Sequence, residues 1–139
     1  MKNPLIKKEL NPKHSLQGKC ILIIEDNLEL NEVLSYQLSA HGCQVLTAPE
    51  PKFGIRLALT NKIDLILLDI NLPIMSGHET LAHLKTDAKT SSIPICIMTG
   101  DTTPRTAKIM KVFKVDSILQ KPFGQRELFD KIERLLKLK

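Results

Sequence analysis

The sequence predicts an α/β protein built on a doubly wound parallel sheet of five strands, with helices on both faces. Two observations lead to this fold class. Apolar runs of strand length alternate five times with segments of helical periodicity, and the connections between them are short. Such alternation is typical of βαβ units, whose right-handed crossovers place helices on the faces of the sheet. Ligands of these sheets bind at the carboxyl ends of the strands.

The first half of the chain supplies two strands and two helices. Residues 20–24 are a continuous apolar run, as in a strand buried on both faces. A helix follows to Ala40, because Asn27 is a suitable N-cap and His41-Gly42 a suitable stop. Residues 43–47 form a short second strand, and residues 52–59 a short amphipathic helix. The apolar positions of the first helix recur at helical spacing: Leu28, Leu30, Val33, Leu34 and Leu38.

The second half continues the alternation. The third strand lies within residues 64–73, where an apolar run ends at Asp69 and a proline-bearing turn. Ser76-Gly77 precedes a helix whose apolar positions are 81, 82 and 84. The remaining elements are a strand over 93–98, a helix over 102–113 with Pro104 in its first turn, a strand over 115–119 and a helix over 125–138.

Length and charge indicate a single cytoplasmic domain with a basic leader. The 139 residues suit one domain, no apolar run is long enough to cross a membrane, and no signal peptide begins the chain. The net charge of +5 lies at the ends: residues 1–19 carry five lysines against Glu9, which gives +4. We expect residues 1–18 to be a loosely ordered extension, residues 19–139 to be the domain, and no output domain to follow.

Polar residues gather where the predicted strands end. Because parallel strands end at the same edge of a sheet, these side chains are expected to converge: Glu25, Asp26, Asp69, Asn71, Thr99 and Lys121. Taken singly, each has another explanation, such as an acidic first turn of a helix for Glu25-Asp26 or a surface position for Lys121. Together they indicate chemistry at one site.

The chemistry that fits this collection is phosphoryl transfer. Three carboxylates repel one another unless a cation neutralises them, and hard oxygen ligands favour Mg²⁺. Mg²⁺ and Lys121 together suit a phosphoryl group, which a carboxylate can attack to form an acyl phosphate. Thr99 can donate a hydrogen bond to that group, and no histidine base is needed.

The residues around these positions resemble the receiver domain of two-component response regulators over residues 19–138. The matching motifs are Ile-Ile-Glu25-Asp26-Asn27, Leu-Leu-Asp69-Ile-Asn71-Leu-Pro73-Ile-Met75-Ser-Gly77, Met-Thr99-Gly100 and Lys121-Pro122-Phe123. The resemblance implies a flavodoxin-like sheet with strand order 2-1-3-4-5. It also implies a phospho-accepting regulator that acts through changed protein contacts or by relaying phosphate, and not an enzyme with a separate substrate.

The resemblance also assigns roles to individual residues. Asp69 is the expected phospho-acceptor, Thr99 the switch hydroxyl and Lys121 the phosphate-binding lysine, with a cis Lys121-Pro122 bond. Mg²⁺ is the expected cofactor, bound by Asp26 and Asp69, by Glu25 through water and by the backbone carbonyl of Asn71. The expected donor is the phosphohistidine of a sensor histidine kinase or of a histidine phosphotransfer protein.

Two features depart from the family. Ile118 occupies the position of the fifth strand where most receivers carry an aromatic residue, and Lys114-Val115 replaces the usual Gly-Ala pair. We therefore expect phosphorylation to be retained and its transmission to the surface to be altered. Arg105, Lys108, Lys111 and Lys114 recur at three-residue spacing, which indicates either a solvated helix face or a docking surface for an acidic partner within residues 104–120.

Two other functions use some of the same features. A haloacid-dehalogenase-like phosphotransferase also uses an aspartyl nucleophile and Mg²⁺, but it needs a second acid two residues later, where this chain has Asn71. A nucleic-acid-binding module could use the basic ends, but lysines without interleaved aromatic residues or arginines are a weak signal. The three cysteines, odd in number and each in an apolar run, favour buried free thiols.

Overall fold

The computed structural model describes residues 16–71, 76–100, 103–115 and 117–137. Five parallel strands form one sheet in the order β2-β1-β3-β4-β5, as the sequence predicted. The strands are β1 Cys20–Ile24, β2 Gln44–Ala48, β3 Leu65–Asp69, β4 Ile95–Thr99 and β5 Ser117–Gln120. The helices are α2 Leu28–Ala40, α3 Pro51–Thr60, α4 Gly77–Thr86, α5 Pro104–Val112 and α6 Gln125–Leu135.

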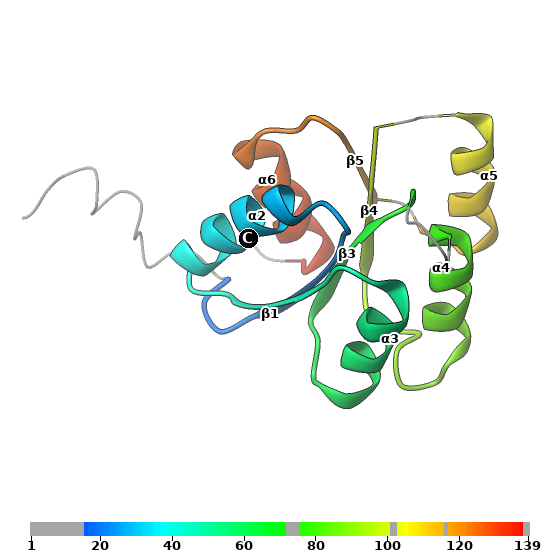
Figure 1. Ribbon diagram of the computed structural model, residues 1–139, viewed down its shortest axis with the longest axis horizontal. Coiled ribbons are helices and arrows are strands. Elements are labelled where there is room, and N and C mark those ends of the chain that lie inside the picture. Colours follow the sequence, from blue (N-terminus) through cyan, green and yellow to red (C-terminus); the bar gives the residue numbers. More distant parts are fainter. Residues whose placement is uncertain (1–15, 72–75, 101–102, 116, 138–139) are drawn as a thin grey trace, which may run out of the picture.

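Helices cover both faces of the sheet (Figure 1). Helices α2 and α6 lie on one side, and α3, α4 and α5 lie on the other. Every residue of β1, β3 and β4 is buried, which explains why these strands are apolar without alternation. Successive residues of a strand contribute to opposite cores: Leu22 and Ile24 belong to the core under α3, α4 and α5, whereas Ile21 and Ile23 belong to the core under α2 and α6.

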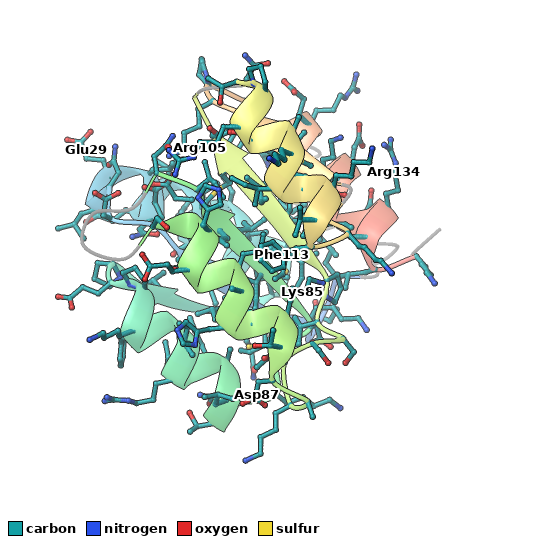
Figure 2. The ribbon with its side chains drawn as sticks, turned by 90° about the vertical axis from the view of Figure 1, so that its right-hand side faces the viewer. Glu29, Lys85, Asp87, Arg105, Phe113 and Arg134 are labelled. Atoms are coloured by element: carbon teal, nitrogen blue, oxygen red, sulfur yellow. The ribbon has the colours of Figure 1, made fainter. Side chains whose placement is uncertain are left out.

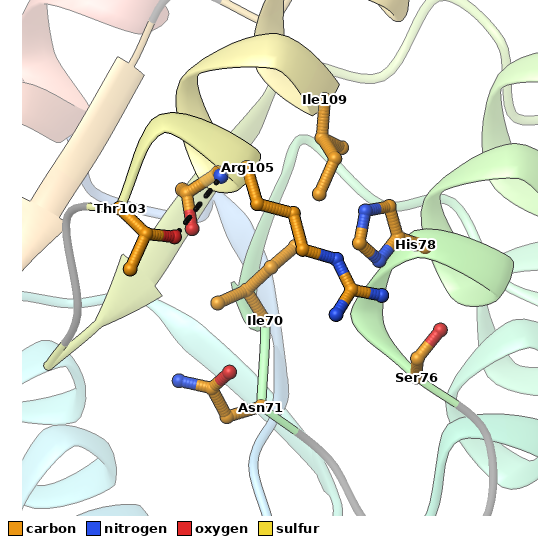
Figure 3. A pocket seen from close by; sticks show the side chains of 8 residues that line it. Ile70, Asn71, Ser76, His78, Thr103, Arg105 and Ile109 are labelled. Carbon is orange, nitrogen blue, oxygen red and sulfur yellow. Dashed lines mark hydrogen bonds between the residues drawn. The ribbon is translucent and has the colours of Figure 1, made fainter.

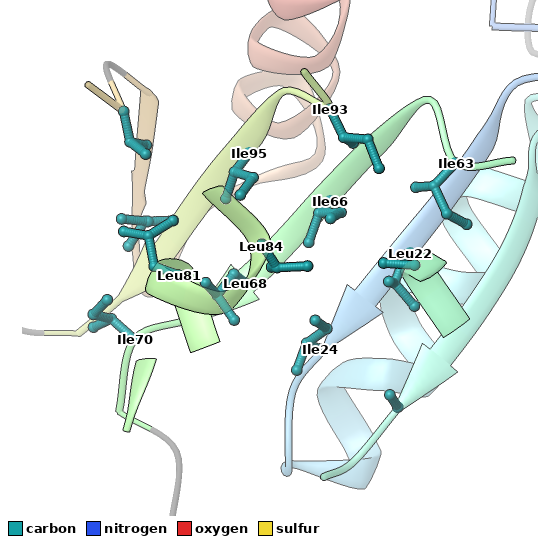
Figure 4. Packing of buried hydrophobic residues seen from close by; sticks show 14 of the residues in the cluster. Leu22, Ile24, Ile63, Ile66, Leu68, Ile70, Leu81, Leu84, Ile93 and Ile95 are labelled. Carbon is teal, nitrogen blue, oxygen red and sulfur yellow. The ribbon is translucent and has the colours of Figure 1, made fainter. Parts of the chain in front are cut away.

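The core under α3, α4 and α5 fixes the position of α4 on the sheet. Figure 4 shows Leu81 and Leu84 of α4 packed over the strand residues Ile66 and Leu68. All four side chains are fully buried. A side chain of this size contributes about 1.5–3 kcal/mol when it is removed from water, so this packing holds the start of α4 close to the end of β3.

Several element ends differ from the predicted ones by one to three residues, and three strands start later than predicted because the chain turns where the apolar pattern continues. The second strand starts at Gln44 and not at Cys43, because the Cys43 amide donates a hydrogen bond to Leu38 of the helix that is ending. The fifth strand starts at Ser117, because the Val115 amide donates to Met110 in the turn after α5. The fourth strand starts at Ile95, because Ile93 is part of a turn closed on Thr90.

Two apolar residues of α2 do not face the core. Leu28 is 65% exposed and Val33 is 51% exposed, although both belong to the apolar periodicity of the helix. The buried side of α2 is set by Leu34 and Leu38, and at 3.6 residues per turn Leu28 and Val33 lie about 80–140° away from these two residues.

The packed domain begins before residue 19. Leu16 is fully buried in the core under α2 and α6, and the Gly18 amide donates a hydrogen bond to the Gly42 carbonyl at 2.8 Å. Residues 16–18 therefore pack against the domain, although they were assigned to the basic extension. The rest of that extension, residues 1–15, lies outside the described residues.

Candidate functional site

The predicted site residues lie at one edge of the sheet, at the carboxyl ends of four strands. Asp69 and Thr99 are the last residues of β3 and β4, while Glu25 directly follows β1 and Lys121 directly follows β5. The parallel pairing of β1, β3, β4 and β5 brings these four ends together. The prediction that they converge is confirmed by this arrangement.

Three carboxylates form the acidic part of the site. One oxygen atom from each of Glu25, Asp26 and Asp69 lies within 4.8 Å of the other two. Glu25 is 1% exposed and Asp69 is 4% exposed, whereas Asp26 faces solvent. Buried carboxylates at this spacing repel one another strongly, so a divalent cation would stabilise the cluster. The cluster is therefore suited to bind a metal ion through oxygen ligands.

Lys121 supplies the cationic part of the site. Its Nζ donates a hydrogen bond to Oε1 of Glu25 at 2.5 Å and lies 3.8 Å from Oδ2 of Asp69. The backbone holds the lysine at this place, because its amide donates to the Thr99 carbonyl at 2.7 Å. The Lys121-Pro122 bond is cis, as expected. The ammonium group is thus placed between two buried carboxylates.

Burial changes the acid–base behaviour of Glu25. The pKa of its carboxyl is raised to about 7, mainly because burial disfavours the charged form, with a further contribution from the neighbouring Asp69. The hydrogen bonds from Lys121 and from the Asn27 amide, the latter 3.1 Å long, lower the pKa again but do not offset the burial. The protonation state of Glu25, and with it the net charge of the site, therefore changes close to neutral pH.

Asn71 and Thr99 connect the acceptor carboxylate to the neighbouring strand. The Asn71 amide donates to Oδ1 of Asp69 at 3.0 Å, and the Asn71 side chain reaches Oγ1 of Thr99 at 3.5 Å. Thr99 is fully buried. The bond from the Asn71 amide holds Oδ1 of Asp69 against the loop, while Oδ2 of Asp69 faces Lys121. The proposed role of the Asn71 carbonyl as a metal ligand stays a prediction.

Sequence reasoning missed Asn31. This residue is buried on α2, and its Nδ2 donates to the backbone carbonyl of Glu25 at 2.6 Å. Its Oδ1 is also buried and has no hydrogen-bond partner among the described residues. Asn31 therefore fastens the loop that carries Glu25 and Asp26 to the helix that follows. The available signal was a polar residue on the buried side of an amphipathic helix.

An acidic cluster beside a lysine, at the edge where a doubly wound sheet binds ligands, matches the site expected from the resemblance to receiver domains. Comparison with known families agrees. The family model for the response regulator receiver domain matches residues 21–133, and the chain belongs to this family. Its function class is that of two-component signalling, and receiver domains are signalling modules, not classical enzymes.

Individual relatives support the assignment. PhoB, the phosphate regulon transcriptional regulatory protein of Pseudomonas aeruginosa, is 32% identical over 120 residues, which cover 86% of this chain and 52% of that protein. The chemotaxis protein CheY4 of Vibrio cholerae has a TM-score of 0.81 at 24% identity and covers 85% of this chain and 98% of its own. The receiver domain of the Pseudomonas aeruginosa sensor histidine kinase PA1611, whose structure holds a magnesium ion in its active site cleft, has a TM-score of 0.79 at 24% identity over 86% and 98% of the two chains.

The comparisons do not favour the two alternatives, a haloacid-dehalogenase-like phosphotransferase and a nucleic-acid-binding module. The chain spans about half the length of the first curated relatives that it matches, among them full-length transcriptional regulators. In the described part of the chain, no helix has the length and apolar character needed to cross a membrane. All three cysteines are free and buried, as predicted.

Proposed function

We propose that Asp69 accepts a phosphoryl group from a phosphohistidine donor in a Mg²⁺-dependent reaction. The observation that carries the proposal is the position of the Asp69 carboxylate, with Oδ1 held by the Asn71 amide and Oδ2 turned toward the Lys121 ammonium group. In this reaction an oxygen of Asp69 attacks phosphorus and a P–O bond forms. The P–N bond to the donor imidazole breaks, and its electron pair stays on the imidazole nitrogen.

The other residues of the site have supporting roles. Glu25, Asp26 and Asp69 would hold Mg²⁺, with the Asn71 carbonyl as a further ligand, and the ion would neutralise charge on the phosphoryl oxygens. Lys121 balances the same charge from the other side, and Thr99 donates a hydrogen bond to the transferred group. Because the three carboxylates repel an anion, the metal and the lysine are both needed before a phosphoryl group can approach.

Intact mass measurement after incubation with a small phosphodonor and Mg²⁺ tests the proposal. We expect one added phosphoryl group, absent in Asp69→Asn and suppressed by a chelator. Asp64→Asn is the matched control, because Asp64 lies next to the amino end of β3 and its Oδ2 accepts from the Cys20 amide at 2.8 Å. An unchanged mass in the wild-type protein, or loss of phosphorylation in both variants, would contradict the assignment of Asp69.

We also propose that the basic face of α5 contacts a downstream partner. Arg105, Lys108, Lys111 and Lys114 are all exposed, and Figure 2 shows α5 beside α4 at the surface with Arg105 labelled. A partner with an acidic surface would match this charge. As part of this proposal, phosphorylation of Asp69 affects this face in an altered way, because Ile118 replaces the usual aromatic residue. We place the protein in the cytoplasm, where the donor kinase presents its phosphohistidine.

A pull-down with the downstream partner tests the basic face. Lys108→Glu with Lys111→Glu should abolish binding, because both changes reverse the charge at the centre of this face. The control is Lys52→Glu with Lys62→Glu, which changes the net charge equally at exposed positions in and just after α3. Binding that survives the first pair, or that is lost equally with both, would remove α5 as the contact surface.

A further inference from the structure

A cavity of about 320 Å³ adjoins the acceptor loop, between the first turns of α4 and α5 (Figure 3). Its size is at the lower end of the range for pockets that bind small organic ligands. Asn71 reaches its edge, but none of Glu25, Asp26, Asp69 or Lys121 lines it. The cavity is therefore a neighbour of the acceptor site with a separate set of side chains.

The described side chains that line the cavity include positive charge and no negative charge. Arg105 and His78 line it, and none of the described lining residues is acidic. Figure 3 shows the Arg105 side chain extending from α5 across the cavity, with its guanidinium group on the side of His78 and Ser76. Among the described residues no carboxylate forms a salt bridge with Arg105. The guanidinium group thus offers several N–H donors to the cavity, and none of the described lining residues is an anionic partner for it.

Two hydroxyl groups add neutral donors. Oγ of Ser76 accepts a hydrogen bond from the Glu79 amide at 3.3 Å, and Oγ1 of Thr103 accepts one from the Thr106 amide at 3.5 Å. Each oxygen is used as an acceptor, so its O–H proton is directed elsewhere and can be donated to a ligand. Because these residues are the N-caps of α4 and α5, the positive ends of both helix dipoles also point toward the cavity.

An independent sign of the local charge comes from His78. Burial lowers the pKa of its imidazole, and the positive charge of Arg105 lowers it further. The two groups are therefore close enough to influence one another electrostatically. An anion between them would favour the protonated form of His78.

Two apolar side chains also line the cavity. They are Ile70, directly after β3, and Ile109, on the second turn of α5, and the rest of the lining is formed by Asn71 and Thr106. Both side chains belong to the core under α3, α4 and α5. Each is 6% exposed, so only a small apolar surface faces the cavity; a ligand with a small apolar group would cover it, whereas an inorganic anion would not.

We propose that this cavity binds a small organic anion, with its carboxylate or phosphate group on Arg105, Ser76 and Thr103 and its apolar group on Ile70 and Ile109. The proposal does not rest on phosphorylation of Asp69. It assigns to Arg105 a role separate from that of Lys108 and Lys111, which lie on the same helix but do not line the cavity.

An NMR titration with isobutyrate and with acetate, at constant ionic strength and with a chelator present, tests the proposal. We expect saturable shifts of the amides of residues 76–80 and 103–107 and of the Arg105 Nε–H group, with tighter binding of isobutyrate. In Arg105→Gln the affinity should fall at least about tenfold, because a charge-assisted hydrogen bond is lost. Lys108→Gln, one turn further along α5, should bind as the wild type does.

Several results would overturn the proposal. Shifts that grow linearly without saturation would show general ion effects, and equal losses in Arg105→Gln and Lys108→Gln would show attraction to the basic helix as a whole. Equal affinity for acetate and isobutyrate would remove the contribution of Ile70 and Ile109. Asp69→Asn separates this site from the acceptor site, because it should abolish phosphorylation and leave isobutyrate binding unchanged; weakened binding there would contradict two separate sites.

Discussion

Gly77, the first residue of α4, is the position where the smallest change should have a large effect. A Cβ atom added there would lie 2.5 Å from both the Cα and the carbonyl oxygen of Ile70 and 2.8 Å from its carbonyl carbon. Non-bonded carbon atoms prefer a separation of about 3.5–4.0 Å, so the two backbones would have to separate by about 1 Å. The obstacle is main chain, which has no rotamer to change.

The surrounding hydrogen bonds oppose this separation. The Gly77 amide donates to the Ile70 carbonyl at 3.1 Å, and the Ile70 amide donates to the Met98 carbonyl of β4 at the same distance. Overpacking costs about 1–3 kcal/mol, and loss of the first bond adds about 1 kcal/mol. The better helix propensity of alanine returns at most about 1 kcal/mol. We expect Gly77→Ala to lower the free energy of unfolding by about 2 kcal/mol.

Urea unfolding followed by circular dichroism measures this change, and the midpoint should fall by about 1 M for a protein of this size. Gly100→Ala is the control, because a Cβ at Gly100 meets no atom within 4 Å. That variant should stay within about 0.5 kcal/mol of the wild type, as surface substitutions usually do. A Gly77→Ala protein as stable as Gly100→Ala would refute the argument that close backbone approach requires glycine here.

Three further predictions concern the site. In the metal-free protein, the free energy of unfolding should fall as the pH rises from about 5 to 8. The reason is that the pKa of Glu25 is raised to about 7, so the folded state binds the proton more tightly than the unfolded state. Urea midpoints measured across this range should show the slope in the wild type and no such slope in Glu25→Gln. Lys121→Met should cost about 1–2 kcal/mol at pH 8, where Glu25 loses its partner, and much less at pH 5.5, where Glu25 is protonated in both proteins; a loss independent of pH would contradict the pairing. Asn31→Ala should cost about 1–3 kcal/mol in the same unfolding assay, because the Glu25 carbonyl loses a buried donor, while Ser39→Ala on the exposed side of α2 should be neutral.

The strand ends were predictable because they follow from local patterns. Asp69 directly follows an apolar run and Lys121 lies two residues after another, and parallel pairing alone brings such positions to one edge. The boundary at Val115 was not predictable in the same way. Lys114 has a left-handed backbone with φ of 55°, and this turn, closed by the Val115 amide, takes an apolar residue out of the strand. The family usually has glycine at position 114, the residue type that most easily adopts such a φ value.

Contacts between distant segments set the remaining features. Nothing in the local sequence marks Asn31 as a donor to Glu25, because the contact depends on how α2 returns over the end of β1. The same holds for Leu28 and Val33, whose exposure depends on which side of α2 meets the sheet. The periodicity of the sequence predicts that the helix has a buried face, but tertiary packing decides which residues lie at the middle of that face.

Thr99 is the point at which the acceptor site meets the rest of the sheet. Its side chain accepts from Asn71 in the loop after β3, and its carbonyl accepts from the Lys121 amide after β5. On β5 itself, Ile118 is half-buried and packs against the core under α3, α4 and α5, as do Met110 of α5 and Phe113 directly after it. Rotation about χ1 is restricted in a β-branched side chain, so Ile118 is poorly suited to change its side-chain orientation. Thr99 and Ile118 therefore contact different parts of the molecule: Thr99 contacts the acceptor loop and the residue after β5, whereas Ile118 packs against the core under α3, α4 and α5.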